Sequence, residues 1–175
     1  MKLVFPTEHF EEHKLSDQDL VSLKPYGITL MQVPGRPILL LIDDTGHLTL
    51  PVAINPLEAG VTIQQSQTTT PATTPHSVTK ALLDSLNIKI EKCIFVEIKG
   101  HHQYVRLMID GHPTYGSLKF KADEVMSLCI FLNVPIFATK KIVRKSQEMS
   151  AHLEGLAKGI ELNPAVLVRN HEYLC

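Results

Sequence analysis

Two junctions between an apolar stretch and a helix start share one pattern, and they constrain the fold more than any other feature. The first runs from residues 50–54 into Asn55-Pro56-Leu57-Glu58, and the second runs from residues 115–120 into residues 121–125. Each places a carboxylate in the first turn of the expected helix. The repetition predicts a duplicated strand-strand-helix unit in which Glu58 and Glu124 occupy equivalent positions.

A strand meander precedes each of these helix starts. Alternation of apolar and polar residues, interrupted by turn residues, predicts the strands. The expected strands cover residues 20–33, 38–42, 48–54, 88–99, 104–109 and 115–120, and the helices that follow cover residues 56–66 and 121–132. We therefore expect an α+β fold in which duplicated strand-meander-plus-helix units form mixed or antiparallel sheets packed with helices.

Other helices and connections follow from local signals. Thr74-Pro75 predicts a helix to about Asn87, with Val78, Ala81, Leu82 and Leu86 as its apolar stripe, after a loop over residues 66–75. Residues 121–132 are apolar on nearly every side, which predicts a buried helix that also contributes to a homo-oligomer contact. Asn133 is expected to end that helix in a left-handed conformation before a short strand at residues 134–138.

Chain length limits the number of domains. The 175 residues, 44% of them hydrophobic, suffice for one well-packed core. We expect an N-terminal extension over residues 1–19, an α+β domain over residues 20–145, and a C-terminal helical extension over residues 146–175 that could hold a protein partner.

Charge gives a mixed indication about nucleic acid. A net charge of −1 and a pI near 6.7 are not typical of a dedicated nucleic-acid-binding domain. Basic residues nevertheless gather late in the chain, and a helix over residues 139–149 would place four of them on one face. The candidate phosphate contacts are Lys119, Lys121, Lys140, Lys141, Arg144 and Lys145. The alternative is that these residues only keep a surface solvated.

Several classes of protein are disfavoured. Three widely spaced cysteines without a C-x-x-C pair indicate neither a disulfide framework nor a cysteine-rich zinc site, and they favour the cytoplasm. We expect no signal peptide and no membrane span, because no apolar stretch approaches about 18 residues. The absence of a G-x-S-x-G elbow, a phosphate-binding glycine loop and a dinucleotide fingerprint argues against the common hydrolase and nucleotide-binding classes, and no organic cofactor is expected.

The order of the motifs resembles the bifunctional nuclease domain family over about residues 20–143. The resemblance rests on residues 50–59, on Pro75-His76 with Leu82-Leu83, on Lys121-Ala122-Asp123-Glu124-Val125, and on residues 134–137. It implies an α+β domain of a family found in cytoplasmic bacterial proteins and in plant relatives credited with DNase and RNase activity.

The matched positions depart from the family pattern at several places. The family's first helix typically opens Gly-Pro-Phe-Glu-Ala, its second carries His-Asp, and its third opens Arg-Pro-Ser-Asp-Ala. Here Glu58 is unchanged and His76 keeps the histidine, whereas Ser77 replaces the neighbouring acid. Lys121 stands for the arginine, which removes a bidentate grip on phosphate or carboxylate. The chain thus resembles a divergent member.

The resemblance suggests metal-assisted hydrolysis of phosphodiesters. Glu58 with Glu124 or Asp123 would hold Mg²⁺ or Mn²⁺, His76 would transfer protons, and Lys121 would counter phosphate charge beside Lys119. The structural alternatives are that the acids only stabilise helix starts and that His76 has no role. A second class of function is a catalytically eroded regulatory or protein-interaction module on the same scaffold.

Two further histidine patterns have weaker support. His9-Phe10-Glu11-Glu12-His13 matches the inverted zinc-peptidase signature H-x-x-E-H, but it lies at a charged terminus without a core helix to hold it. His101-His102 falls at an expected hairpin tip, where we predict a solvent-facing turn able to bind metal only adventitiously.

Overall fold

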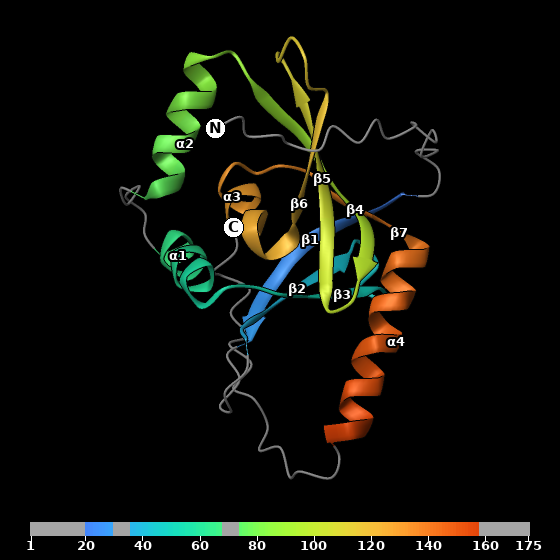
Figure 1. The fold of residues 1–175 in the computed structure, drawn as a ribbon. Coiled ribbons are helices and arrows are strands. Elements are labelled where there is room, and N and C mark those ends of the chain that lie inside the picture. Colours follow the sequence, from blue (N-terminus) through green and yellow to red (C-terminus); the bar gives the residue numbers. More distant parts are fainter. Residues whose placement is uncertain (1–19, 30–35, 68–73, 158–175) are drawn as a thin grey trace, which may run out of the picture.

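The computed structural model describes residues 20–29, 36–67 and 74–157, which form a curled seven-stranded sheet with four helices (Figure 1). The first half contains β1 (Leu20–Thr29), β2 (Ile38–Asp43), β3 (Thr49–Ala53), α1 (Pro56–Gln67) and α2 (Pro75–Ser85). The second half contains β4 (Lys89–Lys99), β5 (His102–Asp110), β6 (Ser117–Lys121), α3 (Ala122–Phe131), β7 (Ile136–Thr139) and α4 (Lys140–Ala157). The H-x-x-E-H pattern, the middle of the predicted loop and the chain after residue 157 lie outside the described residues.

The strand order reveals the duplication predicted from the sequence. It is β3-β2-β1-β7-β4-β5-β6, so two antiparallel meanders flank β7. The only parallel pair among the described strands is β4 with β7. Helix α1 follows the first meander and α3 follows the second, and the two helices pack on each other. The prediction of an α+β fold built from meander-plus-helix units is confirmed.

Curling of the sheet brings its two halves together. Helix α3 contacts β3 of the first meander and also β5 and β6 of the second. The side-chain amide of Gln103 in β5 donates to the carbonyl oxygen of Pro51 in β3 at 2.9 Å and to the Ser146 hydroxyl in α4 at 3.1 Å. In Figure 1, α1 and α3 lie together on one side of the strands, and α4 lies on the other.

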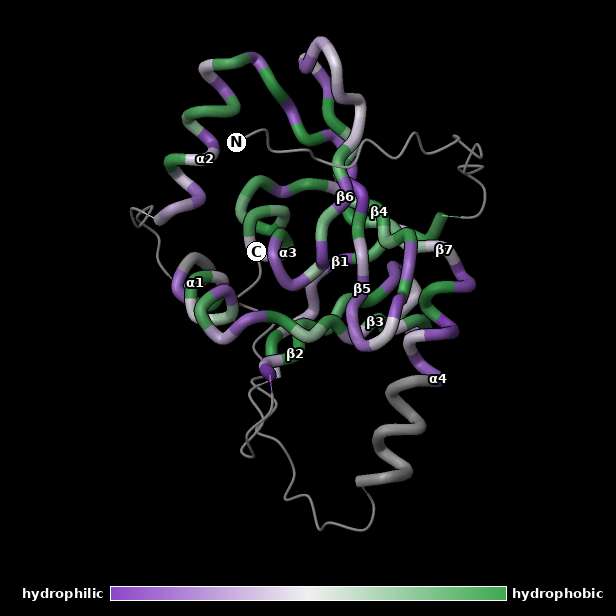
Figure 2. The backbone as a smooth tube through the Cα atoms, viewed as in Figure 1, coloured by the Kyte–Doolittle hydropathy of each residue, from purple (hydrophilic) through white to green (hydrophobic). Residues whose placement is uncertain are grey.

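Strand alternation and the apolar third helix supply the core. Leu41, Leu50 and Phe95 from the strands are fully buried, and Met126 and Cys129 from α3 pack among such side chains. Each fully buried side chain of this kind contributes about 1.5–3 kcal/mol relative to an exposed one. The strands and helices coloured by hydropathy in Figure 2 show the same gathering of apolar segments around α3.

Helix α3 fulfils the prediction of a buried helix within its own domain. Val125, Met126 and Cys129 face the core. The backbone of Asn133 has φ 53°, so the predicted left-handed ending is confirmed. Helix α4 runs without a break through residue 145, where the sequence suggested a domain boundary.

The predicted helix after Thr74 is confirmed as α2, but the surroundings of its apolar stripe and the length of one turn did not follow from the sequence. The predicted apolar stripe of α2 faces solvent, because Val78, Leu82 and Leu86 are 57%, 59% and 63% exposed. A period of 3.6 residues marks a face of a helix without showing what that face contacts. The predicted turn at Gly100–Gln103 is shorter than expected, since β5 begins at His102 and pairs it with Lys99.

No helix among the described residues is long and apolar enough to cross a membrane.

Candidate functional site

Glu58 lies in the first turn of α1 with one carboxylate oxygen turned into the protein. The side-chain oxygen of Asn55 accepts from the Leu57 amide at 3.0 Å, so Asn55 caps this helix start, as its position before Pro56 suggests. Within the described part of the chain, Oε2 of Glu58 is buried and has no hydrogen-bond partner. A buried carboxylate oxygen left in this state costs stability, so a purely capping role does not account for Glu58.

His76 comes from the first turn of α2 and faces Glu58. Its Nε2 lies 3.8 Å from Oε2 of Glu58, which is within ion-pair range but too long for a hydrogen bond. The same nitrogen is 2.9 Å from the Ser127 hydroxyl of α3, and the ring lies 5.8 Å from that of Phe131. His76 is only 9% exposed. Helix α1 carries the acid, α2 carries the histidine, and α3 holds the histidine through Ser127, so three helices position this acid–histidine pair.

The geometry of Glu58, His76 and Ser127 differs from that of a serine hydrolase. In such a triad the acid binds Nδ1 of the histidine while Nε2 faces the serine. Here the acid and the serine face the same nitrogen, and Ser127 is buried. The arrangement therefore supplies a histidine able to move a proton beside a carboxylate, without an accessible serine nucleophile.

The acids at the start of α3 have protein partners. Asp123 binds Arg36 with 3.0 Å between Oδ2 and the guanidinium nitrogen. Glu124 is exposed, and its Oε2 accepts from the Lys121 amide at 3.3 Å, which closes the helix start. Asp123 and Ser127 lie four residues apart, so they share one face of α3.

A metal ion would find few ready-made protein ligands in the described structure. Its histidines, cysteines and acids form no group of three or more that could hold a metal ion. Two atoms of the site nevertheless suit a divalent cation. They are the buried Oε2 of Glu58 and the neighbouring Nε2 of His76, since a carboxylate oxygen and an imidazole nitrogen can both ligate such an ion. Mg²⁺ commonly binds one or two carboxylates and completes its coordination with substrate phosphates and water.

The predicted phosphate contacts are dispersed. Lys119 pairs with Glu97, holding the pKa of that carboxyl below its usual range, and lies 4.9 Å from the Tyr104 ring. The basic residues of α4 are exposed, and Lys145 also donates to the carbonyl oxygen of Ile98 at 3.3 Å. In Figure 1, α4 lies across the strands from α1. The fold brings Glu58 and His76 together but places the basic face of α4 elsewhere.

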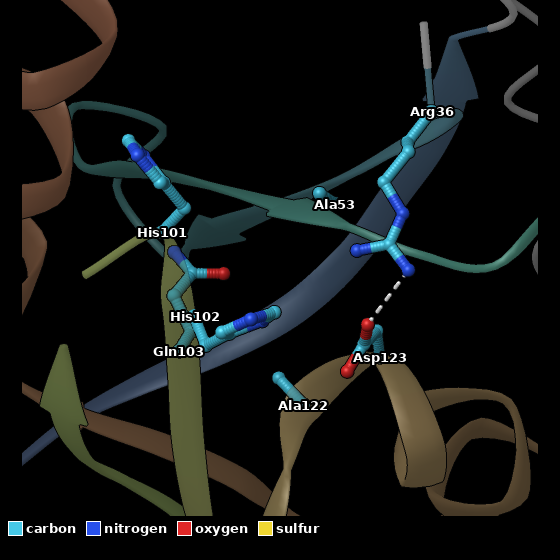
Figure 3. Close-up of a pocket in the computed structure, with 7 residues that line it drawn as sticks. All are labelled: Arg36, Ala53, His101, His102, Gln103, Ala122 and Asp123. Carbon is cyan, nitrogen blue, oxygen red and sulfur yellow. Dashed lines mark ion pairs between the residues drawn. The ribbon is translucent and has the colours of Figure 1, made fainter. Parts of the chain in front are cut away.

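A polar pocket near the start of α3 is not apparent from the sequence. Its lining, shown in Figure 3, consists of Arg36, Ala53, His101, His102, Gln103, Ala122 and Asp123. These residues come from separate parts of the chain. Local patterns identify the histidine pair and the acid but give no sign that sheet curling makes them neighbours of Arg36.

The fold and site define an α+β domain of two meander-plus-helix units whose helices bring a carboxylate and a histidine together. The model of the bifunctional nuclease domain matches residues 39–151, more than half of the chain, so the protein belongs to that family. No curated protein shows significant similarity to the chain.

Proposed function

We propose that the protein is a divalent-metal-dependent nuclease that hydrolyses phosphodiester bonds in DNA, RNA or both. Membership in the bifunctional nuclease domain family supports a nuclease-like function. The observation that carries the proposal is Oε2 of Glu58, which is buried without a hydrogen-bond partner among the described residues and lies 3.8 Å from Nε2 of His76. Nucleic acid is the substrate that this family membership favours.

Each residue has a distinct role in the proposed reaction. A bound Mg²⁺ or Mn²⁺ would polarise the phosphate and favour ionisation of attacking water. Glu58 would hold the cation through Oε2, and His76 would accept or return a proton at Nε2, with Ser127 fixing the ring. Lys121 would counter the charge of the phosphate.

Asp123 and Glu124 are further proposed metal ligands and are catalytic only in that capacity. In this structure Asp123 binds Arg36, and Glu124 binds the Lys121 amide. One of the two acids would join Glu58 on the cation, and it would give up its protein partner to do so. The exposed position of Glu124 makes that exchange easier than for Asp123, whose side chain is 14% exposed.

The direct test is cleavage of labelled single-stranded DNA, double-stranded DNA and RNA with Mg²⁺, Mn²⁺ or EDTA. Wild type is compared with Glu58→Gln, His76→Gln and Glu124→Gln, and Glu91→Gln serves as the matched control because Glu91 is exposed on β4. We expect metal-dependent cleavage that falls at least about 100-fold in the first two variants and is retained in the control. Circular dichroism verifies that each variant folds.

Absence of cleavage by purified wild type would overturn the nuclease proposal. Cleavage that survives in both Glu58→Gln and His76→Gln would instead place the active site elsewhere.

A regulatory or protein-interaction module is the second candidate, favoured by the exposed apolar stripe of α2. Here the stripe would contact a partner, and the half-buried Ile130, Phe131 and Leu132 would contribute to the proposed homo-oligomer. Saturable Mn²⁺ binding that disappears in Glu58→Ala separates the enzyme from this module. Lack of both Mn²⁺ binding and cleavage would favour the module.

A further inference from the structure

The polar pocket at the start of α3 brings an arginine, two histidines and an aspartate together around a small space. Arg36 and Asp123 form one side, and the β4–β5 hairpin supplies His101 and His102 on the other (Figure 3). Ala53 and Ala122, whose side chains are short, leave the space between them open. The empty space at this place, part of which is open solvent, is about 220 Å³.

Arg36 can serve two anionic groups at once. One amino group of its guanidinium binds Asp123, whereas Figure 3 shows the other directed toward the middle of the pocket. The guanidinium carries five donors in a planar fork, so the ion pair with Asp123 does not exhaust its donors. Asp123 fixes the position of this fork at the pocket wall.

His102 faces Arg36 across the pocket. In Figure 3 its ring extends toward Asp123, whereas the ring of His101 points away from the middle. The neighbouring Gln103 holds the start of β5 through its bonds to Pro51 and Ser146. His102 therefore projects from an anchored strand start, and an N–H of its ring can donate to an oxyanion.

The size of the pocket limits the ligand. The space is small and partly open to solvent, so it suits a single phosphate group better than an entire nucleoside. Arginine recognises phosphate through paired, charge-assisted hydrogen bonds. A carboxylate beside the phosphate can accept from a sugar hydroxyl, which gives Asp123 a role in addition to holding Arg36.

We propose that this pocket binds the terminal phosphate of a nucleic-acid strand, with Arg36 and His102 on the phosphate and Asp123 on the adjoining sugar. The proposal rests on the proposed function for its choice of nucleic acid as ligand. A terminal phosphate monoester carries more charge than an internal diester and presents more free oxygens to Arg36. The pocket thus selects strand ends, whereas Glu58 and His76 act on the bond that is cut.

The test measures binding in EDTA, where the proposed metal-dependent cleavage is switched off. Fluorescence anisotropy compares one labelled oligonucleotide bearing a 5′-phosphate, a 3′-phosphate or only hydroxyl ends. We expect a terminal phosphate to tighten binding about tenfold, the effect of roughly one charge-assisted hydrogen bond. Arg36→Ala and His102→Asn should abolish that preference, and Arg36→Lys should reduce it.

Arg144→Ala is the matched control because Arg144 is an exposed arginine that does not line the pocket. It should leave the preference unchanged even if it weakens binding to every strand. Competition with nucleoside 5′-monophosphate or inorganic phosphate distinguishes recognition of a strand end from recognition of phosphate alone. Inorganic phosphate that competes as well as a phosphorylated strand would overturn the assignment to strand ends.

Equal affinity of wild type for all strands, or a preference retained in both Arg36→Ala and His102→Asn, would also overturn the proposal. The two proposals fail separately. A preference for terminal phosphate in a protein that cleaves nothing would overturn only the nuclease, whereas cleavage without any such preference would overturn only the pocket assignment.

Discussion

Glu58 of α1 and His76 of α2 face each other with 3.8 Å between Oε2 and Nε2, and the Ser127 hydroxyl of α3 lies 2.9 Å from the same nitrogen. The contact joins the two halves of the duplication, because α1 follows the first meander and α3 follows the second. A cluster built in this way depends on the packing of α1 against α3. A change in the packing of α1 against α3 would therefore change the distances between these three side chains.

Ser127→Ala should loosen the histidine without unfolding the domain. Loss of the hydroxyl removes the 2.9 Å hydrogen bond to Nε2 in a buried place, which costs about 1 kcal/mol of the free energy of unfolding. Urea denaturation measures that loss, and the ¹⁵N chemical shift of His76 Nε2 should change. Ser85→Ala is the control, since Ser85 is exposed and bonds only within α2 among its described contacts. An unchanged Nε2 signal would contradict the role assigned to Ser127.

Leucine truncation should distinguish the core from the exposed stripe of α2. Leu50→Ala removes a fully buried side chain and should lower the free energy of unfolding by about 2–5 kcal/mol. Leu82→Ala removes a side chain that is mostly exposed and should stay within about 0.5 kcal/mol of wild type. Chemical denaturation checks both. A loss in Leu82→Ala approaching that of Leu50→Ala would show that the stripe is covered in solution.

The sequence predicts those features of the fold and the site that depend on local signals, and it does not predict those that depend on tertiary packing. Local signals identify Glu58 and His76, because Asn55-Pro56 and Thr74-Pro75 define where their helices begin. The conformation of Asn133 is equally local. What surrounds α2 depends on tertiary packing, so the periodicity that locates its apolar stripe does not show that the stripe is exposed.

The pocket lined by Arg36 and His102 illustrates the other limit. Its residues are far apart in the chain and become neighbours only because the sheet curls and β5 approaches β3. The turn between β4 and β5 contains only Gly100 and His101, whereas the sequence suggested a turn over residues 100–103. His102 therefore lies on a strand rather than in a turn.

Gly111 should tolerate a side chain far less than Gly100. Both glycines have positive φ, 84° and 59°, but a Cβ at Gly111 would overlap the carbonyl oxygen of Asn87, whereas a Cβ at Gly100 would meet open space. Gly100→Ala should cost about 1–2 kcal/mol from backbone strain alone, and Gly111→Ala should cost more. Thermal and urea unfolding of the two variants measures the difference. Equal losses would contradict the close approach of residue 111 to Asn87.

Asp43 should make stability depend on acidic pH. The Thr45 hydroxyl and the Leu48 amide donate to its carboxylate at 2.5 and 3.0 Å and hold the pKa of Asp43 below its usual range. A lowered folded-state pKa contributes stability that is present above the ordinary carboxyl pKa of about 4 and is lost as the pH falls through the folded-state value. Asp43→Asn should therefore be less stable than wild type at pH 7, with the difference shrinking below about pH 4. Asp44→Asn is the control, because Asp44 is exposed and pairs only with exposed Lys24 among its described partners.

The basic face of α4 should govern the salt dependence of nucleic-acid binding if it contacts phosphates. Lys140, Lys141 and Arg144 are exposed while Ile142 and Val143 between them are buried, so replacing the three with glutamine removes charge and leaves the core packing intact. For each phosphate that the variant no longer neutralises, the slope of log K against log salt should fall by about 0.7 for single strands and about 0.9 for duplex DNA. The matched control replaces Lys24, Lys80 and Lys89, which are also exposed but lie on other elements. Equal changes in slope for the two triple variants would show that net charge, rather than this face of α4, sets the affinity.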